Sequence, residues 1–281
     1  MGPTYAEAVN KHYGPTDISA RIIERLQQAG RDIGNLSRED LAPFDEFHGG
    51  GRESTRELAQ FARLRPGLDV LDVGSGIGGP ARTLAAEFGC QVIGMDLTEE
   101  FCRAAEMLTD MVGLGGKVRF RCANALEMPF ADASFDVVWS QNTLMNIEDK
   151  APLFREIRRV LRPGGMFAFE TVLAGTVPGI HFPVFWADSS ALSFLVTPAA
   201  LKGLLSSAGM GETGWDDTTA RSIVNQKKRK AAMQRDGPPV LGLGVIVPKD
   251  VLAKMDNVLR NNEEARTATV QAVYAAGESA A

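Results

Sequence analysis

One stretch of ten residues constrains the fold of this chain more than any other. Residues 70–79 read VLDVGSGIGG, an apolar run and an aspartate followed by a glycine-rich segment. The apolar run predicts a buried strand, and the glycines predict a tight turn that opens a helix near Pro80. Such a turn lets a ligand approach the backbone, and the free N–H groups of the following helix point toward it. The sequence therefore predicts a cofactor-binding loop here.

Apolar runs of strand length alternate with helical patterns around this loop. The expected strands are residues 69–73, 91–96, 118–122, 135–140, 166–171, about 212–217 and 267–274, and the expected helices are residues 80–88, 98–112, 149–160 and 198–208. Thr98 and Asp149 stand where N-caps are preferred, and the RPGG segment at 162–165 is expected to end a helix. Strands that alternate with helices form parallel sheets. We therefore expect an α/β fold with a doubly wound, Rossmann-like, mostly parallel seven-stranded sheet.

The chain is expected to divide into four parts. Residues 1–43 form an N-terminal helical lid in this interpretation, because apolar positions recur at helical spacing over residues 17–30. Residues 44–219 form the core that carries most of the sheet, residues 220–265 form an inserted helical cap, and residues 266–281 form the final strand and tail. The apolar connection at 173–197 is unusually long, which is typical of a segment that binds a ligand.

Asp72 indicates which cofactor the loop binds. Gly74, Gly76 and Gly79 also match a dinucleotide-binding turn, and Asp96 lies where a ribose-binding carboxylate is expected. However, a carboxylate two residues before the first glycine would repel the pyrophosphate of a dinucleotide. S-adenosylmethionine carries an ammonium and a sulfonium, which Asp72 attracts. We expect this methyl donor, with an NAD(P)-dependent oxidoreductase and a non-catalytic cofactor-binding protein as alternatives.

Five segments in a fixed order resemble the motifs of class I S-adenosylmethionine-dependent methyltransferases. They are VLDVGSGIGG at 70–79, IGMDLT at 93–98, ANALEMPF at 123–130, FDVVWSQNTLMNI at 135–147 and VLRPGG at 160–165. The resemblance covers about residues 45–208. FDEFHGGGREST at 44–55 and WSQN at 139–142 look like the sarcosine/dimethylglycine N-methyltransferase branch. The resemblance implies transfer of a methyl group to a small-molecule acceptor through an N, O or C nucleophile.

The expected cofactor-binding residues follow the ends of the first strands. They are Tyr13, Asp72, Gly74, Ser75, Gly76, Asp96, Leu97, Asn124, Ala125, Leu126 and Gln141. Asp96 is expected to hold the ribose hydroxyls, with a helix cap as the alternative. Asn124 is expected to accept a hydrogen bond from the adenine amino group, with a plain turn residue as the alternative.

His48, Gln141 and His181 are the candidate catalytic residues. His48 precedes three glycines and is expected to contact the carboxylate of the cofactor or the acceptor. Gln141 can hydrogen-bond but has no titrating group, so it cannot act as a base. For His181, substrate contact and simple packing are both open.

The expected substrate-binding residues are Phe185, Trp186, Asn142 and Asn146. The two aromatic residues could form the wall of an acceptor pocket, although such residues are usually core. Because no arginine or lysine lies between Phe167 and Leu201, we expect a partly apolar acceptor rather than a small anionic one such as sarcosine. Sarcosine/dimethylglycine N-methylation is kept as the alternative.

Composition excludes several classes of partner. A net charge of −5 argues against nucleic acid, and the basic run at 227–230 is interpreted as a solvated helix face. Cys90, Cys102 and Cys122 lack metal-ligand spacing and are expected to be buried thiols, so no metal is expected. No run approaches the roughly 20 apolar residues of a membrane span. We expect a cytoplasmic monomer or homodimer.

Overall fold

Seven strands form one sheet in a computed structural model of the chain, which describes residues 17–46, 48–247 and 249–277. The strands are β1 (Asp69–Val73), β2 (Gln91–Asp96), β3 (Val118–Cys122), β4 (Phe135–Gln141), β5 (Leu161–Ala174), β6 (Met210–Asp217) and β7 (Thr267–Ala276). Their order in the sheet is β3-β2-β1-β4-β5-β7-β6. The first five pair in parallel, whereas β7 is antiparallel to β5 and β6. The expected doubly wound, mostly parallel sheet is confirmed.

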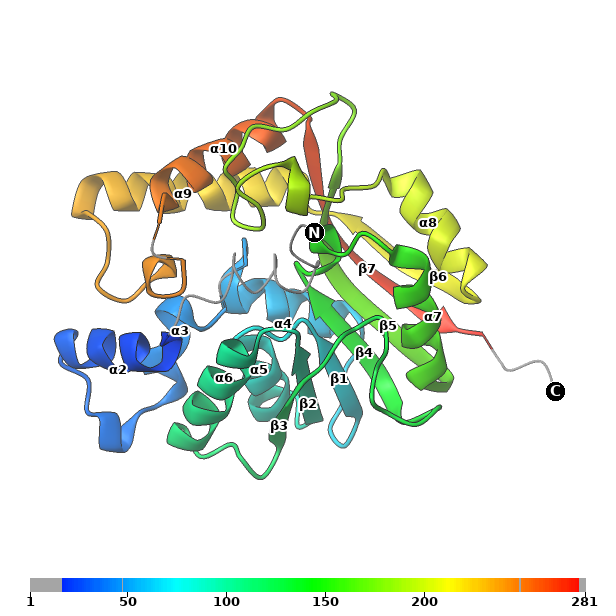
Figure 1. Ribbon diagram of the computed structural model, residues 1–281, viewed down its shortest axis with the longest axis horizontal. Helices are drawn as coiled ribbons and strands as arrows, with labels where there is room; N and C mark the ends of the chain where they lie inside the picture. Colours follow the sequence, from blue (N-terminus) through cyan, green and yellow to red (C-terminus); the bar gives the residue numbers. More distant parts are fainter. Residues whose placement is uncertain (1–16, 47, 248, 278–281) are drawn as a thin grey trace, which may run out of the picture.

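Helices cover both faces of this sheet (Figure 1). They are α2 (Ile18–Gln28), α3 (Arg38–Asp45), α4 (Gly51–Phe61), α5 (Gly79–Glu87), α6 (Glu99–Met111), α7 (Lys150–Val160), α8 (Pro198–Ser207), α9 (Thr219–Asp236) and α10 (Val251–Glu263). Short 3-10 helices span Ile33–Asn35, Leu144–Asn146, Ser190–Leu192 and Leu243–Val245.

The central strands are buried on both faces, as in parallel sheets generally. On β4, Val138 packs into one core cluster with Phe154 and Phe167, while Trp139 packs into another with Leu84 on the opposite face. All of these side chains are fully buried. The apolar runs of the sequence therefore become a two-sided core, and only the ends of the strands are free to carry polar functional groups.

The strand order reverses between β1 and β4, which lie side by side although β2 and β3 separate them in sequence. Open α/β sheets bind ligands beyond the carboxyl ends of their strands at such a switch point. Here those ends are the glycine turn after β1 and Gln141 at the end of β4.

Local details differ from the sequence expectations. Thr98 and Asp149 occupy N-cap positions, but neither side chain accepts a capping hydrogen bond. The RPGG segment lies inside β5 as an irregularity, because pairing with β4 shifts after Phe135↔Leu161 and resumes at Val137↔Met166. Cys122 is exposed rather than buried, since β3 is an edge strand.

Helix α2 of the N-terminal region packs against α6, and the role of residues 1–43 as a lid stays a prediction. Helix α2 buries Ile18, Ile22 and Leu26 in a cluster with Phe101 and Leu108 of α6. It therefore lies against the side of the domain (Figure 1). Residues 1–16, including Tyr13, lie outside the described residues.

The segment after β6, which is expected to be helical, forms two helices. Helices α9 and α10 lie side by side along the top of the view in Figure 1, beyond the ends of the strands. Among residues 17–46, 48–247 and 249–277, no helix combines the length and apolar character needed to cross a bilayer.

Candidate active site

A cavity of about 250 Å³ open to water-sized molecules lies at the switch point. Its lining comes from the turns after β1 to β4, from the start of α4, from the segment after β5, and from α9 and α10. Among the described residues, its lining includes these expected site residues: Gly74, Ser75, Gly76, Asp96, Leu97, Asn124, Ala125, Leu126, Gln141, Asn142, Asn146, His48, Phe185 and Trp186. Segments far apart in the sequence thus meet in one place.

The turn after β1 is held by a backbone hydrogen bond, and it has no room for a side chain at Gly74. Gly74 donates its N–H to the Met95 carbonyl at 2.7 Å and has φ 76°, which favours glycine. A Cβ on Gly74 would lie 2.0 Å from Thr143 Oγ1. Any other residue at position 74 would therefore clash with the side chain of Thr143.

Asp96 fixes this turn from the end of β2. Its Oδ2 accepts the N–H of Gly76 at 2.9 Å, and its Oδ1 accepts the N–H of Thr98 at 2.8 Å. Burial raises the pKa of Asp96 above its ordinary value. The structural role is thus observed. Each carboxylate oxygen has a further lone pair for a ligand, so the expected ribose contact stays a prediction that these contacts allow.

Asp72 lies beneath the turn rather than in the cavity lining. Its side chain is 1% exposed, and Oδ2 has no hydrogen-bond partner among the described residues. Burial, together with the charges of Asp96 and Glu46, raises the pKa of Asp72 to about 8. A cation above the turn would relieve this crowding of acidic groups, whereas an added anion would increase it.

The side chain of Asn124 makes a hydrogen bond within its own turn, as a plain turn residue would. Its Oδ1 accepts the N–H of Leu126 at 3.0 Å. The oxygen expected to accept from adenine is thus already used within the turn, with one lone pair remaining. Together with Ala125, these residues form the part of the cavity beyond β3.

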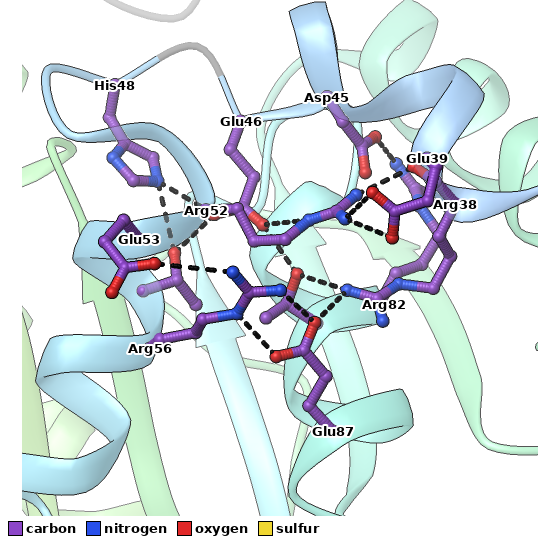
Figure 2. Close-up of polar contacts among 12 residues, drawn as sticks. Arg38, Glu39, Asp45, Glu46, His48, Arg52, Glu53, Arg56, Arg82 and Glu87 are labelled. Atoms are coloured by element: carbon purple, nitrogen blue, oxygen red, sulfur yellow. Dashed lines mark hydrogen bonds and ion pairs between the residues drawn. The ribbon is translucent and has the colours of Figure 1, made fainter.

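His48 is held between two buried carboxylates, which the sequence analysis did not identify. Its Nε2 lies 3.3 Å from Glu46 Oε2, and its Nδ1 lies 3.8 Å from Glu170 Oε1. Figure 2 shows the imidazole directed toward Glu46. Burial alone would lower the pKa of His48, but the hydrogen bond to Glu46 and the charge of Glu170 raise it above the ordinary value.

Each of the two carboxylates is fixed by hydroxyl or amide groups. Glu46 accepts from Thr55 at 2.5 Å and from Thr83 at 2.6 Å. Glu170 accepts from Ser54, and from Gln271 at 2.8 Å. Although burial opposes it, hydrogen bonding from His48 and the threonines holds the pKa of Glu46 below its usual range. His48 Nδ1 has no hydrogen-bond partner among the described residues.

Gln141 and Asn142 end β4 beside this cluster. Trp139 donates its indole N–H to Gln141 Oε1 at 3.0 Å, so the amide oxygen faces the tryptophan. Gln141 Nε2 is then buried without a partner among the described residues. Asn142 adopts φ 54° and donates to Glu170 Oε1 at 3.2 Å. A left-handed residue at a strand end beside a cavity is a feature of functional sites.

The segment after β5 provides an apolar wall, but its residues differ in role. Phe185 is half-buried and lines the cavity. Trp186 is 4% exposed and packs with Met145 and Val184, while its indole donates to Ser193 Oγ at 2.9 Å. Asn146 donates to the carbonyl of Trp186 at 2.7 Å. Trp186 and Asn146 therefore support the wall that Phe185 presents.

The expectation of a catalytic role for His181 must be corrected. Its Nε2 lies 2.9 Å from Glu264 Oε2, and its backbone N–H is bound by Asn261. It is not part of the cavity lining. The connection turns His181 toward α10, where it joins this helix to the segment after β5.

The interpretation of the basic run at 227–230 as a solvated helix face holds for only two of its four residues. Lys227 and Lys228 are exposed, as a solvated helix face requires, but Arg229 and Lys230 line the cavity. A run of four residues spans more than one full helical turn, so its members cannot all face the same way. A cation near the acceptor region is thus supplied from α9 rather than from the connection after β5.

The functional residues that were missed share a sequence signal. Glu170 interrupts the apolar run MFAFETV, and Gln271 interrupts TATVQAV. A polar side chain in an otherwise buried strand needs partners, so it marks a polar network. Within the described residues, no group of three or more His, Cys, Asp or Glu side chains is placed to hold a metal ion.

The fold and the cavity define a Rossmann-like domain with a ligand site at the switch point of its sheet. Residues 71–169 match the methyltransferase domain family. The chain therefore contains a class I S-adenosylmethionine-dependent methyltransferase domain, as its motifs predict.

Similar proteins carry different activities. Phosphoethanolamine N-methyltransferase 1 from Arabidopsis thaliana is 40% identical over 116 residues, which are 41% of this chain and 23% of that protein. The chain thus spans about a quarter of the length of this relative. A Galdieria sulphuraria protein assigned as a sarcosine dimethylglycine methyltransferase has a TM-score of 0.64 and 20% identity, covering 80% of this chain and 84% of its own.

The [4+2]-cyclase SpnF has a TM-score of 0.70 and 20% identity, covering 99% of this chain and 98% of its own. At 20% identity, the similarity to the Galdieria protein and to SpnF shows a shared fold and no more. Because a cyclase also has this fold, the activity of the present chain must be argued from its own site.

Proposed function

We propose that this chain transfers the methyl group of S-adenosylmethionine to a small-molecule acceptor. The observation that carries the proposal is the buried carboxyl group of Asp72 beneath the glycine turn. Its Oδ2 has no hydrogen-bond partner among the described residues. A ligand with an ammonium and a sulfonium fits there, because its charges offset those of Asp72, Asp96 and Glu46. A dinucleotide would bring a pyrophosphate to the same place, which disfavours an NAD(P)-dependent oxidoreductase.

The residues after β1 to β3 would hold the cofactor. Asp96 would bind the ribose hydroxyls, and the turn at Asn124 to Leu126 would hold the adenine. When bound, S-adenosylmethionine supplies an activated methyl group. The protein must then place the acceptor nucleophile in line with that group and exclude water, which can contribute roughly 7–11 kcal/mol to catalysis.

His48 would act as the general base for an acceptor that arrives protonated. With Nε2 hydrogen-bonded to Glu46, the neutral ring carries its lone pair on Nδ1, which is buried and lies 3.8 Å from Glu170 Oε1. His48 itself is part of the cavity lining. The proton taken from the acceptor would form an imidazolium between Glu46 and Glu170. Gln141 Nε2 and Asn142 would orient the acceptor or the cofactor by hydrogen bonds.

The acceptor would contact Phe185, so an apolar portion fits the pocket. Sarcosine/dimethylglycine-type N-methylation regains weight, because Arg229 provides the cation that the connection after β5 lacks. The cytoplasmic location and the monomeric or homodimeric state remain predictions.

A methyl-transfer assay with labelled S-adenosylmethionine tests this proposal. The acceptor panel should contain amines, hydroxy-aromatics, thiols and prenyl-like compounds, each with a matched N- or O-methylated control. We expect label transfer to at least one acceptor class, reduced in His48→Gln. Binding of a nicotinamide dinucleotide without binding of S-adenosylmethionine would contradict the proposal.

A further inference from the structure

Helix α9 presents a wholly polar face to the cavity. The lining residues from this helix are Arg221, Ser222, Asn225, Gln226, Arg229 and Lys230. They recur at intervals of three and four, so they share one side of the helix. No residue of α9 is buried. The face opposite the strand ends is therefore hydrophilic, in contrast to the wall at Phe185.

The cations on this face differ in their pairing. Arg221 lies 3.2 Å from Glu57 and 3.0 Å from Asp216, and Lys230 lies 2.6 Å from Asp256. Arg229 has no acidic partner among the described residues, although it is half-buried and burial lowers its pKa. A guanidinium that is partly removed from water without a counter-ion loses hydration that an anion can replace.

The two carboxylates beside His48 are engaged by other partners. Glu170 is bound by Ser54, Asn142 and Gln271, and Glu46 by Thr55, Thr83 and His48. These contacts hold both carboxylates on the sheet side. They leave the guanidinium of Arg229 available to a ligand.

Arg229 reaches toward the start of α4, beside His48. A Cβ on Gly51 would lie 3.9 Å from Arg229 Nη2, so the guanidinium lies next to the first residue of α4. The charge of Arg229 acts to lower the pKa of His48, which places the two groups near each other. An anionic group bound at Arg229 would bring the rest of its molecule close to the His48 ring.

We propose that Arg229 is the specificity residue that binds an oxyanion of the acceptor, a carboxylate or a phosphate. The acceptor is then amphipathic, with its anionic end at α9 and its apolar part against Phe185. A planar guanidinium suits such a group because it can donate two parallel hydrogen bonds. This inference rests on the proposed function, since it assigns the second substrate of the same cavity.

The test is calorimetric titration of the full chain, first with S-adenosylhomocysteine and then, at saturation, with pyrophosphate and with succinate. The variants are Arg229→Gln and Arg229→Lys, with Lys228→Gln as control, because Lys228 is exposed on the same helix. We expect at least one anion to bind, with affinity reduced about 10-fold or more in Arg229→Gln. Arg229→Lys should retain part of the affinity, and Lys228→Gln should behave as the wild type.

Three results would overturn the inference. They are the absence of anion binding to the wild type, an equal loss in Lys228→Gln, and a loss in Arg229→Gln confined to S-adenosylhomocysteine, which would assign Arg229 to the carboxylate of the cofactor. Failure of S-adenosylhomocysteine to bind the wild type would instead refute the proposed function, so the two failures are distinguishable.

Discussion

Replacement of Asp72 by asparagine tests two effects of this buried acid: the loss of folding stability that it causes, and its contribution to the affinity for S-adenosylmethionine. The pKa of Asp72 is raised from 3.8 to about 8, chiefly by burial. Between these values the folded protein holds a proton that the unfolded chain has lost, so this group makes stability fall as pH rises from about 4 to 8. At about 1.4 kcal/mol for each unit, its penalty grows by about 3–4 kcal/mol between pH 5 and pH 8. Asparagine does not titrate and removes this pH dependence.

Urea unfolding of the cofactor-free protein at pH 5 and pH 8 measures the effect. We expect Asp72→Asn to gain stability relative to the wild type by about 3–4 kcal/mol more at pH 8 than at pH 5. The control is Asp149→Asn, an exposed aspartate whose side chain makes no capping bond. The same Asp72→Asn protein should bind S-adenosylmethionine about 10- to 100-fold more weakly, since the cationic cofactor loses the attraction of the buried charge beneath the turn.

Binding should also release protons at pH 7, because the cationic cofactor favours ionised Asp72. Calorimetry in phosphate and in Tris reports this release through the ionisation heat of the buffer. A stability difference that is the same at both pH values would show that Asp72 is not protonated in the empty site. Unchanged cofactor affinity in Asp72→Asn would show that the acid orders the loop only.

Four other substitutions test single contacts of the site. Asp96→Ala should weaken the cofactor by about 2–3 kcal/mol in calorimetry and also lower the melting temperature, because Gly76 and Thr98 lose their acceptor; unchanged cofactor affinity would limit Asp96 to a structural cap. His48→Gln should abolish the acidic limb of the kcat/KM profile, which in the wild type falls as pH drops through the raised pKa of His48; a limb that persists would assign it to another group. Phe185→Ala should raise KM for the acceptor at constant cofactor affinity, whereas Trp186→Ala should destabilise the protein by about 3–5 kcal/mol; the reverse pattern would make Phe185 the core residue.

The sheet could be predicted because its signals are local. Apolar runs of strand length depend on neighbouring residues only. The type of an N-cap residue does not by itself fix the capping bond, since Asp17 accepts the N–H of Ala20 at 3.2 Å whereas Thr98 and Asp149 make no such bond. The turns after β1 to β3 could be located for the same reason, since each follows its strand directly, and they line the cavity.

The acceptor side depends on contacts between distant segments. Glu170, Gln271 and Ser54 meet across more than a hundred residues of sequence, and no local pattern links them. The four basic residues at 227–230 predict a solvated face, and only the fold shows that Arg229 and Lys230 turn toward the cavity. The apolar surroundings of His181 leave substrate contact and packing both open, and only the fold of that connection shows that it turns toward Glu264.

The same site would bind a dinucleotide if the charge argument at Asp72 were wrong. Calorimetric titration of the purified chain with S-adenosylmethionine and, separately, with NADH and NADPH therefore tests the central claim most directly. The account predicts saturable binding of S-adenosylmethionine in the micromolar range and no heat with either dinucleotide. Binding of NADH or NADPH with no heat from S-adenosylmethionine would contradict it.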